Sequence, residues 1–193
     1  KEAIKINSIK SINGPFILFN SSIEERKRVE NAINYFKNSN LAERGFILCI
    51  AGKMHKTKYC EYIRELCSNN RNILILDYVN ELEKVWLFLN ASLLISTSIK
   101  EGFGVPVLDA ASIDLPVLGT KLPPYNEIKL LIKNNKISLL DDNFNKPWED
   151  YLNKIKPFNH KNYNNKLKRL NFFKEFIDNY ERRIIFKIKK YII

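Results

Sequence analysis

Residues 101–110 read EGFGVPVLDA, and this decapeptide is the most informative stretch of the chain for both fold and chemistry. An apolar run at 93–95 precedes it and a helical pattern follows it, so it forms a strand–loop–helix junction. Gly102 and Gly104 let the backbone come close to a ligand, and the amides beyond them begin a helix with its positive end outward. Such a junction suits a diphosphate.

Two carboxylates flank the glycines: Glu101 precedes them, and Asp109 follows with seven residues between the two acids. Phosphate groups need amide or cationic donors, whereas the vicinal hydroxyls of a sugar are donors that carboxylates accept. Amides for phosphate and acids for hydroxyls together indicate a nucleotide-sugar ligand. A nicotinamide site fits less well, because it needs its turn after the first strand and a third glycine, where Val107 stands here.

Outward from the junction, short apolar runs alternate with longer amphipathic stretches. The runs are apolar on both faces and rich in Ile and Leu, which is typical of strands buried in a parallel sheet. Strands that alternate with helices predict a doubly wound, Rossmann-like α/β sheet of about six strands. The predicted strands are 16–20, 46–51, 72–76, 92–96, 116–119 and 137–140. The predicted helices are 24–38, 56–69, 81–90, 105–112 and 125–134.

In the usual order of such a sheet, the first and fourth strands are central neighbours, and ligands bind beyond their carboxyl ends. The first predicted strand ends at Asn20 and is followed by SSIEERK, and the fourth ends near Ser96 and is followed by the glycine junction. Lys27 and Arg26 are therefore expected to face a diphosphate held by the loop at 102–104.

The chain from Pro147 on carries no strand signal. We expect a helix at 148–155, a loop at 157–164 and a long basic helix from Asn165 onward. The apolar stripe of this last helix is more typical of a core or domain contact than of a lipid-binding face. The stripe consists of Leu167, Leu170, Phe173, Phe176 and Ile177.

The predicted organisation is a nucleotide-sugar-binding domain at 14–146 and a helical extension at 147–193, which packs on that domain or on an absent amino-terminal one. With 193 residues, the chain is long enough for one α/β domain with a substantial core. It does not begin with Met and shows no secretory signal, so we expect a fragment or a processed piece of a longer protein. Its apolar runs are shorter than a membrane span needs.

The three cysteines form no paired motif, and Cys60 and Cys67 lie on one face of a predicted helix. Buried thiols in a reducing compartment are the simplest interpretation, and we expect a cytoplasmic protein. The two histidines, His55 and His160, do not cluster with the cysteines, so no zinc site is predicted. We expect His55 in an exposed loop.

The net charge of +11 fits a phosphate-bearing ligand, nucleic acid or the anionic inner face of a membrane. A biased genome is an alternative explanation, because Lys, Asn and Ile are frequent throughout. A nucleic-acid binder would interleave exposed aromatic residues with basic ones, whereas the aromatic residues here fall mostly at helix-core spacing. We therefore expect no nucleic-acid partner, and we keep peripheral membrane contact as an option.

The decapeptide with its flanks resembles the carboxyl-terminal domain of GT-B glycosyltransferases, most closely the retaining family 4. The pattern in that family is Pro-Ser, two variable residues, Glu-Gly-Phe-Gly-Leu-Pro, and then an acid followed by Ala. Ser98, the EGFG run and Pro106 match this pattern, whereas Thr97 replaces its proline. The second acid is usually Glu and is Asp109 here, which has a shorter arm.

A second segment, SSIEERKRVENAINYF, is similar to the family segment Gly-Thr-Ile-Glu-Pro-Arg-Lys-Asn that runs on to a Phe. Lys27 falls on the family's diphosphate-binding lysine. Ser21 stands where Gly is usual, and Ser22 stands where many members carry a phosphate-binding arginine and others Thr. The run PYNE at 124–127 matches the family's Pro-Glu segment after the fifth strand, with Glu127 on its acid.

The resemblance covers residues 14–190 and corresponds to the carboxyl-terminal half of a GT-B enzyme, without the amino-terminal acceptor domain. It implies retaining transfer of a hexose from a nucleoside-diphosphate-sugar to a hydroxyl acceptor, in glycan or surface polysaccharide synthesis, with no cofactor and no essential metal. A glycan or lipid-linked acceptor would bind through the absent domain, so the isolated chain is expected to be inactive.

The resemblance also assigns roles to individual residues. Glu101 and Lys27 are the predicted catalytic residues: Glu101 would hold the hydroxyls of the donor sugar, and Lys27 with the 102–104 amides would stabilise the departing diphosphate. Asp109 would bind the ribose, and the nucleobase would lie after the third strand. The predicted donor-binding residues are Gly102, Phe103, Gly104, Val105, Asp109, Ser22, Tyr78 and Val79.

The alternative hypothesis is a catalytically silent nucleotide-sugar-binding or interaction module that kept the fold and lost turnover. Ser22 in place of an arginine and Asp109 in place of Glu favour this alternative. Turnover separates the two hypotheses, since both predict nucleotide-sugar binding.

Overall fold

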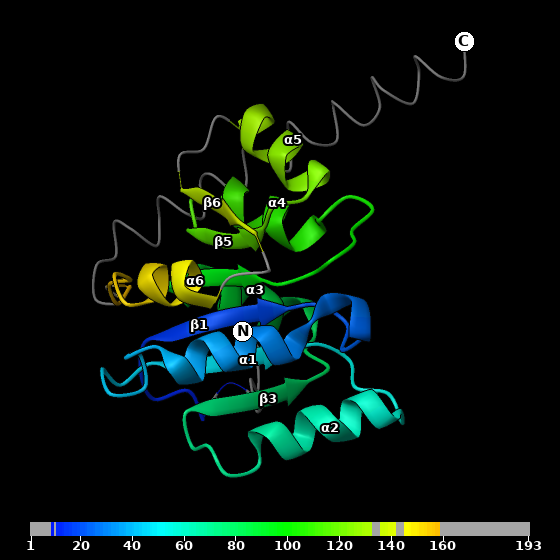
Figure 1. Ribbon diagram of the computed structural model, residues 1–193, viewed down its shortest axis with the longest axis vertical. Helices are drawn as coiled ribbons and strands as arrows, with labels where there is room; N and C mark the ends of the chain where they lie inside the picture. The colour runs from blue at the N-terminus through cyan, green and yellow to red at the C-terminus, as the bar shows by residue number, and fades with distance from the viewer. Residues whose placement is uncertain (1–8, 10, 133–135, 142–144, 159–193) are drawn as a thin grey trace, which may run out of the picture.

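The computed structural model describes residues 9, 11–132, 136–141 and 145–158, which form one parallel sheet with helices on both faces (Figure 1). The order of the six strands is β3-β2-β1-β4-β5-β6, and every neighbouring pair is parallel. The predicted doubly wound, Rossmann-like sheet is confirmed, and its winding reverses between β1 and β4. The strands are β1 (Phe16–Asn20), β2 (Ile47–Ala51), β3 (Ile73–Asp77), β4 (Leu93–Ser96), β5 (Val117–Thr120) and β6 (Ile137–Leu140). The helices are η1 (Glu25–Lys27), α1 (Val29–Asn38), α2 (Lys58–Cys67), α3 (Glu81–Asn90), α4 (Val105–Ser112), α5 (Pro123–Ile132) and α6 (Asn145–Leu152).

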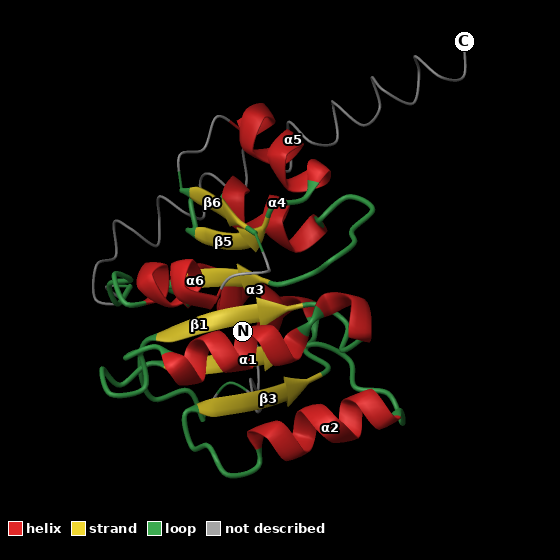
Figure 2. Ribbon diagram, in the orientation of Figure 1, coloured by secondary structure: helices red, strands yellow, loops and turns green. Residues whose placement is uncertain are grey.

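Helices cover both faces of the sheet. Helices α1, α2 and α6 pack on one face, and α3, α4 and α5 pack on the other (Figure 2). Side chains alternate along β1 because successive residues of a strand point to opposite faces. Ile17 and Phe19 therefore enter the first core cluster, while Phe16 and Leu18 enter the second. With both faces covered, the carboxyl edge of the strands is the part of the sheet that loops can shape into a site.

The helix predicted at 24–38 is wrong at its start, because the structure divides it into η1 and α1 with Arg28 between them. Arg28 adopts the left-handed conformation, with φ 49° and ψ 49°, which residues other than glycine rarely take. Its amide donates to the carbonyl of Glu25 at 3.1 Å and closes the short 3₁₀ turn. The turn directs Lys27 into the molecule, where it is only 5% exposed.

Two later helices also begin earlier than predicted. Helix α5 starts at Pro123, since the first turn of a helix does not need the amide that proline lacks. Helix α6 starts at Asn145, and its Trp148 stacks on Tyr35 of α1 with ring centroids 4.8 Å apart. The described part of the predicted extension therefore packs against the sheet domain. The end of the helix predicted at 125–134, most of the predicted loop and the long helix predicted from Asn165 lie outside the described residues.

The cysteines are buried and free, as predicted for reduced thiols. Burial raises the pKa of Cys49 to about 12 and that of Cys67 to about 11, so both thiols stay protonated at neutral pH. His55 lies exposed in the segment after β2, as expected. In the part of the chain that the structure describes, no helix combines the length and hydropathy needed to cross a membrane.

Candidate functional site

The loops after β1 and β4 lie against each other at the carboxyl edge of the sheet. The two strands are neighbours, with Leu18 opposite Leu94. Beyond them, the amide of Ile99 donates to the carbonyl of Arg26 at 2.9 Å, and the Arg26 guanidinium reaches the carbonyl of Lys100 at 3.4 Å. These contacts join the segment that carries Lys27 to the segment that leads into the glycine junction.

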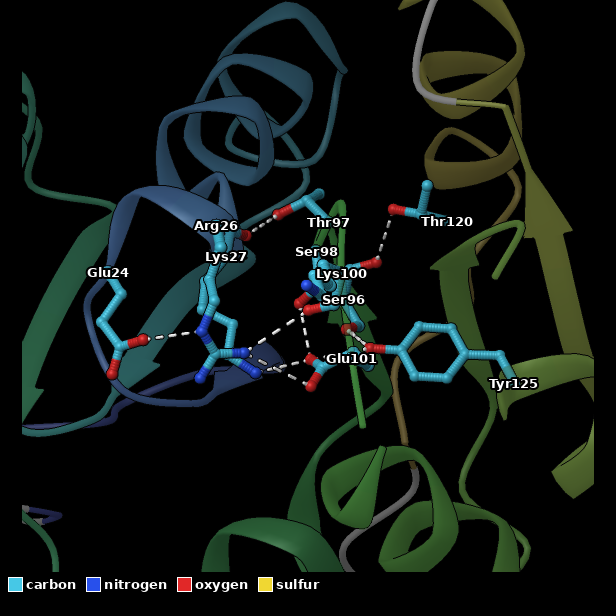
Figure 3. Close-up of polar contacts among 10 residues, drawn as sticks. All are labelled: Glu24, Arg26, Lys27, Ser96, Thr97, Ser98, Lys100, Glu101, Thr120 and Tyr125. Atoms are coloured by element: carbon cyan, nitrogen blue, oxygen red, sulfur yellow. Dashed lines mark hydrogen bonds and ion pairs between the residues drawn. The ribbon is translucent and has the colours of Figure 1, made fainter. Parts of the chain in front are cut away.

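Lys27 and Glu101 form a buried ion pair where the two loops meet (Figure 3). The Lys27 Nζ lies 2.6 Å from the Glu101 Oε1, and the two side chains are 6% and 9% exposed. The residues predicted as diphosphate contact and sugar contact are therefore direct partners of each other. Because both charges are largely removed from water, their geometry matters more than that of a surface pair.

Glu101 is held by four side chains. Its Oε1 accepts hydrogen bonds from Lys27, from Ser98 at 2.7 Å and from the Tyr125 hydroxyl at 3.2 Å, whereas its Oε2 lies 3.7 Å from Arg26 Nη1. Burial raises the pKa of Glu101, but the hydrogen bonds from Lys27, Ser98 and Tyr125 and the charge of Lys27 outweigh it and bring the pKa below its ordinary value. The carboxyl group is therefore ionised at neutral pH.

Tyr125 supports the site from α5, and sequence reasoning missed it. Its hydroxyl bonds to Ser96 Oγ at 2.7 Å as well as to Glu101, and burial raises its pKa well above the ordinary value, so the phenol stays protonated. Glu127, on which the PYNE run places the family's acid, is exposed on the same helix. Nothing in the local sequence distinguishes the tyrosine, because its contact depends on how α5 packs beside β5.

The glycine junction has two different glycines. Gly104 precedes α4 in the left-handed conformation, φ 80°, and a Cβ added there would lie 2.5 Å from the Tyr125 ring. A Cβ added to Gly102 would meet no atom within 4 Å. Phe103 and Val105 are each 48% exposed, and Gly102 is exposed whereas Gly104 is buried, so the junction presents the backbone at Gly102 and two apolar side chains outward.

Asp109 lies on α4 and pairs with Lys84 of α3, with 3.1 Å between Lys84 Nζ and Asp109 Oδ2. Burial raises the pKa of Asp109, and Lys84 only partly opposes this effect. The two residues line a pocket of about 200 Å³ together with Glu81 and Phe88. The structure thus gives Asp109 a place on α4 with its own partner, and no described contact joins it to Glu101.

Tyr78 and Val79 precede α3, whose first turn lines the Asp109 pocket. Tyr78 is 71% exposed and Val79 is half-buried, so both lie where a ligand at the carboxyl edge can reach them. Asn80 then starts α3 with a capping box to Glu83. This cap fixes the entry of the helix and hence the wall of the pocket.

Ser22 is the remaining predicted donor contact, and its hydroxyl lies close enough to Glu24 to lower the pKa of that carboxyl group. Glu24 also accepts from Arg26 Nε at 2.8 Å, and the hydrogen bond from Ser22 is the largest of the effects that lower its pKa. Arg26 therefore links Glu24 to Glu101. Among the described residues, no group of three or more His, Cys, Asp or Glu side chains is arranged to hold a metal ion.

Comparison with known proteins identifies the family. The chain belongs to the family described as glycosyl transferases group 1, whose model matches residues 1–170. The serotype-specific mannosyltransferase WbdA of Escherichia coli is 28% identical to it over 116 residues, which make up 59% of this chain and 14% of that protein. The chain thus spans a small part of the length of this curated relative.

Solved structures share the fold. The carboxyl-terminal domain of the glycosyl transferase group 1 family protein LpcC from Francisella tularensis has a TM-score of 0.60 at 16% identity, with 86% of each chain covered. TarM of S. aureus, in complex with fondaparinux, alpha-GlcNAc-glycerol and UDP, has a TM-score of 0.62 at 18% identity, with 89% of this chain and 34% of TarM covered. At these identities the likeness concerns the fold alone.

Proposed function

We propose that the chain is the donor-binding part of a glycosyltransferase that moves a hexose from a nucleoside-diphosphate-sugar to a hydroxyl group of a glycan or lipid-linked acceptor, with retention of configuration. The observation that carries this proposal is the buried Lys27–Glu101 pair at the switch point, beside the glycine junction. Family membership supports the transfer of glycosyl groups. The UDP complex of TarM, which has the same fold, supports a nucleoside diphosphate as ligand.

Lys27 acts on the departing diphosphate in this proposal. The diphosphate carries the largest charge that develops during transfer, and preorganised positive groups stabilise such charge best in a site that excludes water. Lys27 is buried and already positioned by its bond to Glu101. The amides of 102–104, in the loop that leads into α4, supply further donors to the phosphates.

Glu101 holds the hydroxyls of the donor sugar. Three donors bond to its Oε1, and its Oε2 lies 3.7 Å from Arg26 Nη1. This arrangement leaves Oε2 able to accept from a sugar hydroxyl while Oε1 keeps the side chain in place. Tyr125 and Ser98 are then positioning residues for the carboxylate.

The nucleoside lies toward α3 and α4. The pocket beside Asp109 is the place for the ribose, with the nucleobase against Tyr78 and Val79. Asp109 has to share its carboxylate between Lys84 and the ribose hydroxyls. Ser22 offers a hydroxyl where an arginine would offer a charge, which predicts weaker phosphate binding.

Isothermal titration calorimetry with UDP, GDP, UDP-glucose, UDP-GlcNAc and GDP-mannose tests the proposal directly. We expect at least one nucleotide-sugar to bind, with the same affinity in EDTA, because lysine and helix amides supply the positive charge. Glu101→Gln should weaken the nucleotide-sugar more than the plain diphosphate. Equal losses would remove Glu101 as a sugar contact, and an obligatory need for magnesium or manganese would contradict the proposed site.

A silent binding module is the second candidate, and one specific observation favours it. Lys27 and Asp109 each have a protein partner, in Glu101 and Lys84, so the site is internally neutralised. Transfer assays on a chain extended at its amino terminus separate the two functions. Donor binding without transfer or hydrolysis supports the module, whereas transfer by the extended chain supports the enzyme. In the second case the 193-residue chain is expected to bind the donor without transferring its sugar.

The setting of the reaction is part of the same proposal. We expect the protein in the cytoplasm, with its basic surface against the inner face of a membrane that carries the lipid-linked acceptor. The net charge of +11 supports attraction to anionic lipids. The acceptor would reach the site through an amino-terminal domain.

A further inference from the structure

A second hollow opens beside the candidate donor site, and we refer to it as the tyrosine hollow. Its volume is about 450 Å³, which falls in the range of roughly 300–1,000 Å³ typical of small-molecule sites. It is formed by η1, the first turns of α1 and α2, and the segment after β4. Its lining residues are Glu25, Arg26, Arg28, Glu30, Tyr59, Tyr62 and Ile99.

The lining combines balanced charge with exposed apolar surface. Its two arginines and two glutamates cancel, although the whole chain carries a net charge of +11. Tyr62 is 46% exposed and Ile99 is 43% exposed, and the Tyr62 ring lies 6.5 Å from that of Tyr59 at a tilt of 44°. A site for an anionic ligand is expected to carry surplus positive charge, and this lining carries none. The hollow therefore suits a neutral ligand with both an apolar face and hydroxyl groups.

The polar groups of the hollow are held in place before any ligand arrives. The Tyr59 hydroxyl accepts from the amide of Val29 at 2.9 Å and donates to Glu30. Arg28 Nη1 lies 3.4 Å from Glu30 Oε1. The wall is therefore a network of donors and acceptors, which favours binding because little order is lost when a ligand enters.

Arg26 forms a wall shared by the tyrosine hollow and the donor site. It lines the hollow, bonds to the Lys100 carbonyl at 3.4 Å and lies 3.7 Å from Glu101 Oε2 (Figure 3). A ligand in the hollow is thus separated from the carboxylate proposed to hold the donor sugar by one side chain.

We infer that the tyrosine hollow is a subsite for a neutral sugar residue of the glycan acceptor, an inference that rests on the proposed function. A pyranose has an apolar C–H face, which would lie on the exposed Tyr62 ring, and hydroxyl groups, which would bond to Glu30 and Arg28. The donor-binding part then contributes to acceptor recognition itself, in addition to any contacts from an amino-terminal domain.

Saturation-transfer NMR and chemical-shift titration of the 193-residue chain test this inference, with methyl α-D-mannopyranoside and methyl α-D-glucopyranoside as neutral probes. We expect weak, saturable binding of at least one probe, and a loss of roughly fivefold in affinity in Tyr62→Ala, the magnitude of a lost aromatic contact. Tyr62→Phe keeps the ring and should bind as the wild type does. Glucose 6-phosphate should bind no more tightly than the neutral probes.

Tyr78→Ala is the matched control, because Tyr78 is also an exposed tyrosine but lies at the proposed nucleobase position. It should weaken UDP or GDP binding and leave the glycosides unaffected, while Tyr62→Ala should do the reverse. Glycosides that fail to bind, or that bind equally to Tyr62→Ala, overturn the subsite, as does marked preference for the phosphorylated sugar. Nucleotide binding is measured on the same wild-type sample. If the glycosides bind and the nucleotides do not, the result counts against the donor site alone.

Discussion

The hydroxyl of Thr97 lies 2.7 Å from the carbonyl oxygen of Arg28 and 3.0 Å from that of Lys27, and so ties the end of β4 to the turn before α1. Thr97 is only 1% exposed. A proline, which stands at this position in the family pattern, has no hydroxyl to make this link. Thr97, which is seventy residues from Lys27 in the sequence, therefore holds the left-handed turn in place. This turn points the Lys27 side chain toward Glu101.

Replacing Thr97 by Val should loosen this turn. The Lys27 carbonyl would lose the Thr97 donor, while the Arg28 carbonyl would keep its hydrogen bond from the Asn31 amide, at an expected cost of about 1 kcal/mol in the free energy of unfolding. Because Lys27 would be less well positioned, nucleoside diphosphate affinity should fall as well. Urea denaturation and calorimetry measure the two effects. Thr97→Ser retains the hydroxyl and should restore both, and a valine variant with wild-type affinity would show that the link does not position Lys27.

Replacing Lys27 by Ala should remove the main cationic contact to the diphosphate. The expected loss is about 2 kcal/mol, or roughly thirtyfold in affinity for a nucleoside diphosphate. Lys136→Ala is the control, since Lys136 pairs with Asp114 at 2.5 Å next to the amino ends of β6 and β5, away from the carboxyl edge. Calorimetry on the three proteins decides the matter. Equal affinities in Lys27→Ala and the wild type would take Lys27 out of the site.

The sheet was predictable from the sequence because strand order follows from a general rule. Runs such as 16–20 and 92–96 are apolar on both faces, and the doubly wound pattern then places the first and fourth strands side by side. The glycine junction was equally readable, since Gly102 and Gly104 are local signals. Both features depend on short stretches of sequence and on rules that hold across many proteins.

The parts that sequence reasoning missed depend on long-range contacts. At the break, the Arg28 carbonyl accepts from Thr97, and the local pattern around Arg28 is typical of a continuous helix. Tyr125 contacts Glu101 only because α5 packs beside β5, the neighbour of β4 in the sheet. The pairing of Asp109 with Lys84 requires α3 and α4 to lie together. Each of these contacts is decided by packing, which residue spacing does not encode.

Acidification should weaken the contribution of Glu101 to stability. Burial raises its pKa, but hydrogen bonds led by Lys27 lower it below the ordinary value of 4.5. A carboxyl group with a lowered pKa in the folded state stabilises the protein above its unfolded pKa, and this stabilisation is lost as the pH falls through the folded pKa. The stability difference between the wild type and Glu101→Gln should therefore be constant above about pH 5.5 and shrink below about pH 4.5.

Asp109 offers a control of opposite sign for this measurement. Its pKa is raised by burial above the ordinary value of 3.8, so its ionisation opposes folding as the pH rises. Relative to Asp109→Asn, the wild type should gain stability on acidification through this range. Thermal unfolding from pH 3 to pH 7 measures all three proteins. Parallel curves for the wild type and Glu101→Gln would contradict the lowered pKa.

The two glycines of the junction should respond very differently to alanine. Gly104→Ala places a side chain on a residue with φ 80° and brings its Cβ to 2.5 Å from the Tyr125 ring. The left-handed backbone alone costs about 1–2 kcal/mol, and the ring has to move as well. Because Tyr125 bonds to Glu101, we expect this variant to lose stability and nucleotide-sugar affinity together.

Gly102→Ala meets no atom within 4 Å and should stay close to wild-type stability. Its affinity is then the informative value, since a methyl group on open backbone is harmful only if a ligand approaches it. A Gly102→Ala protein that is stable but binds nucleotide-sugar poorly would locate the diphosphate at the junction, and unchanged binding would place it elsewhere.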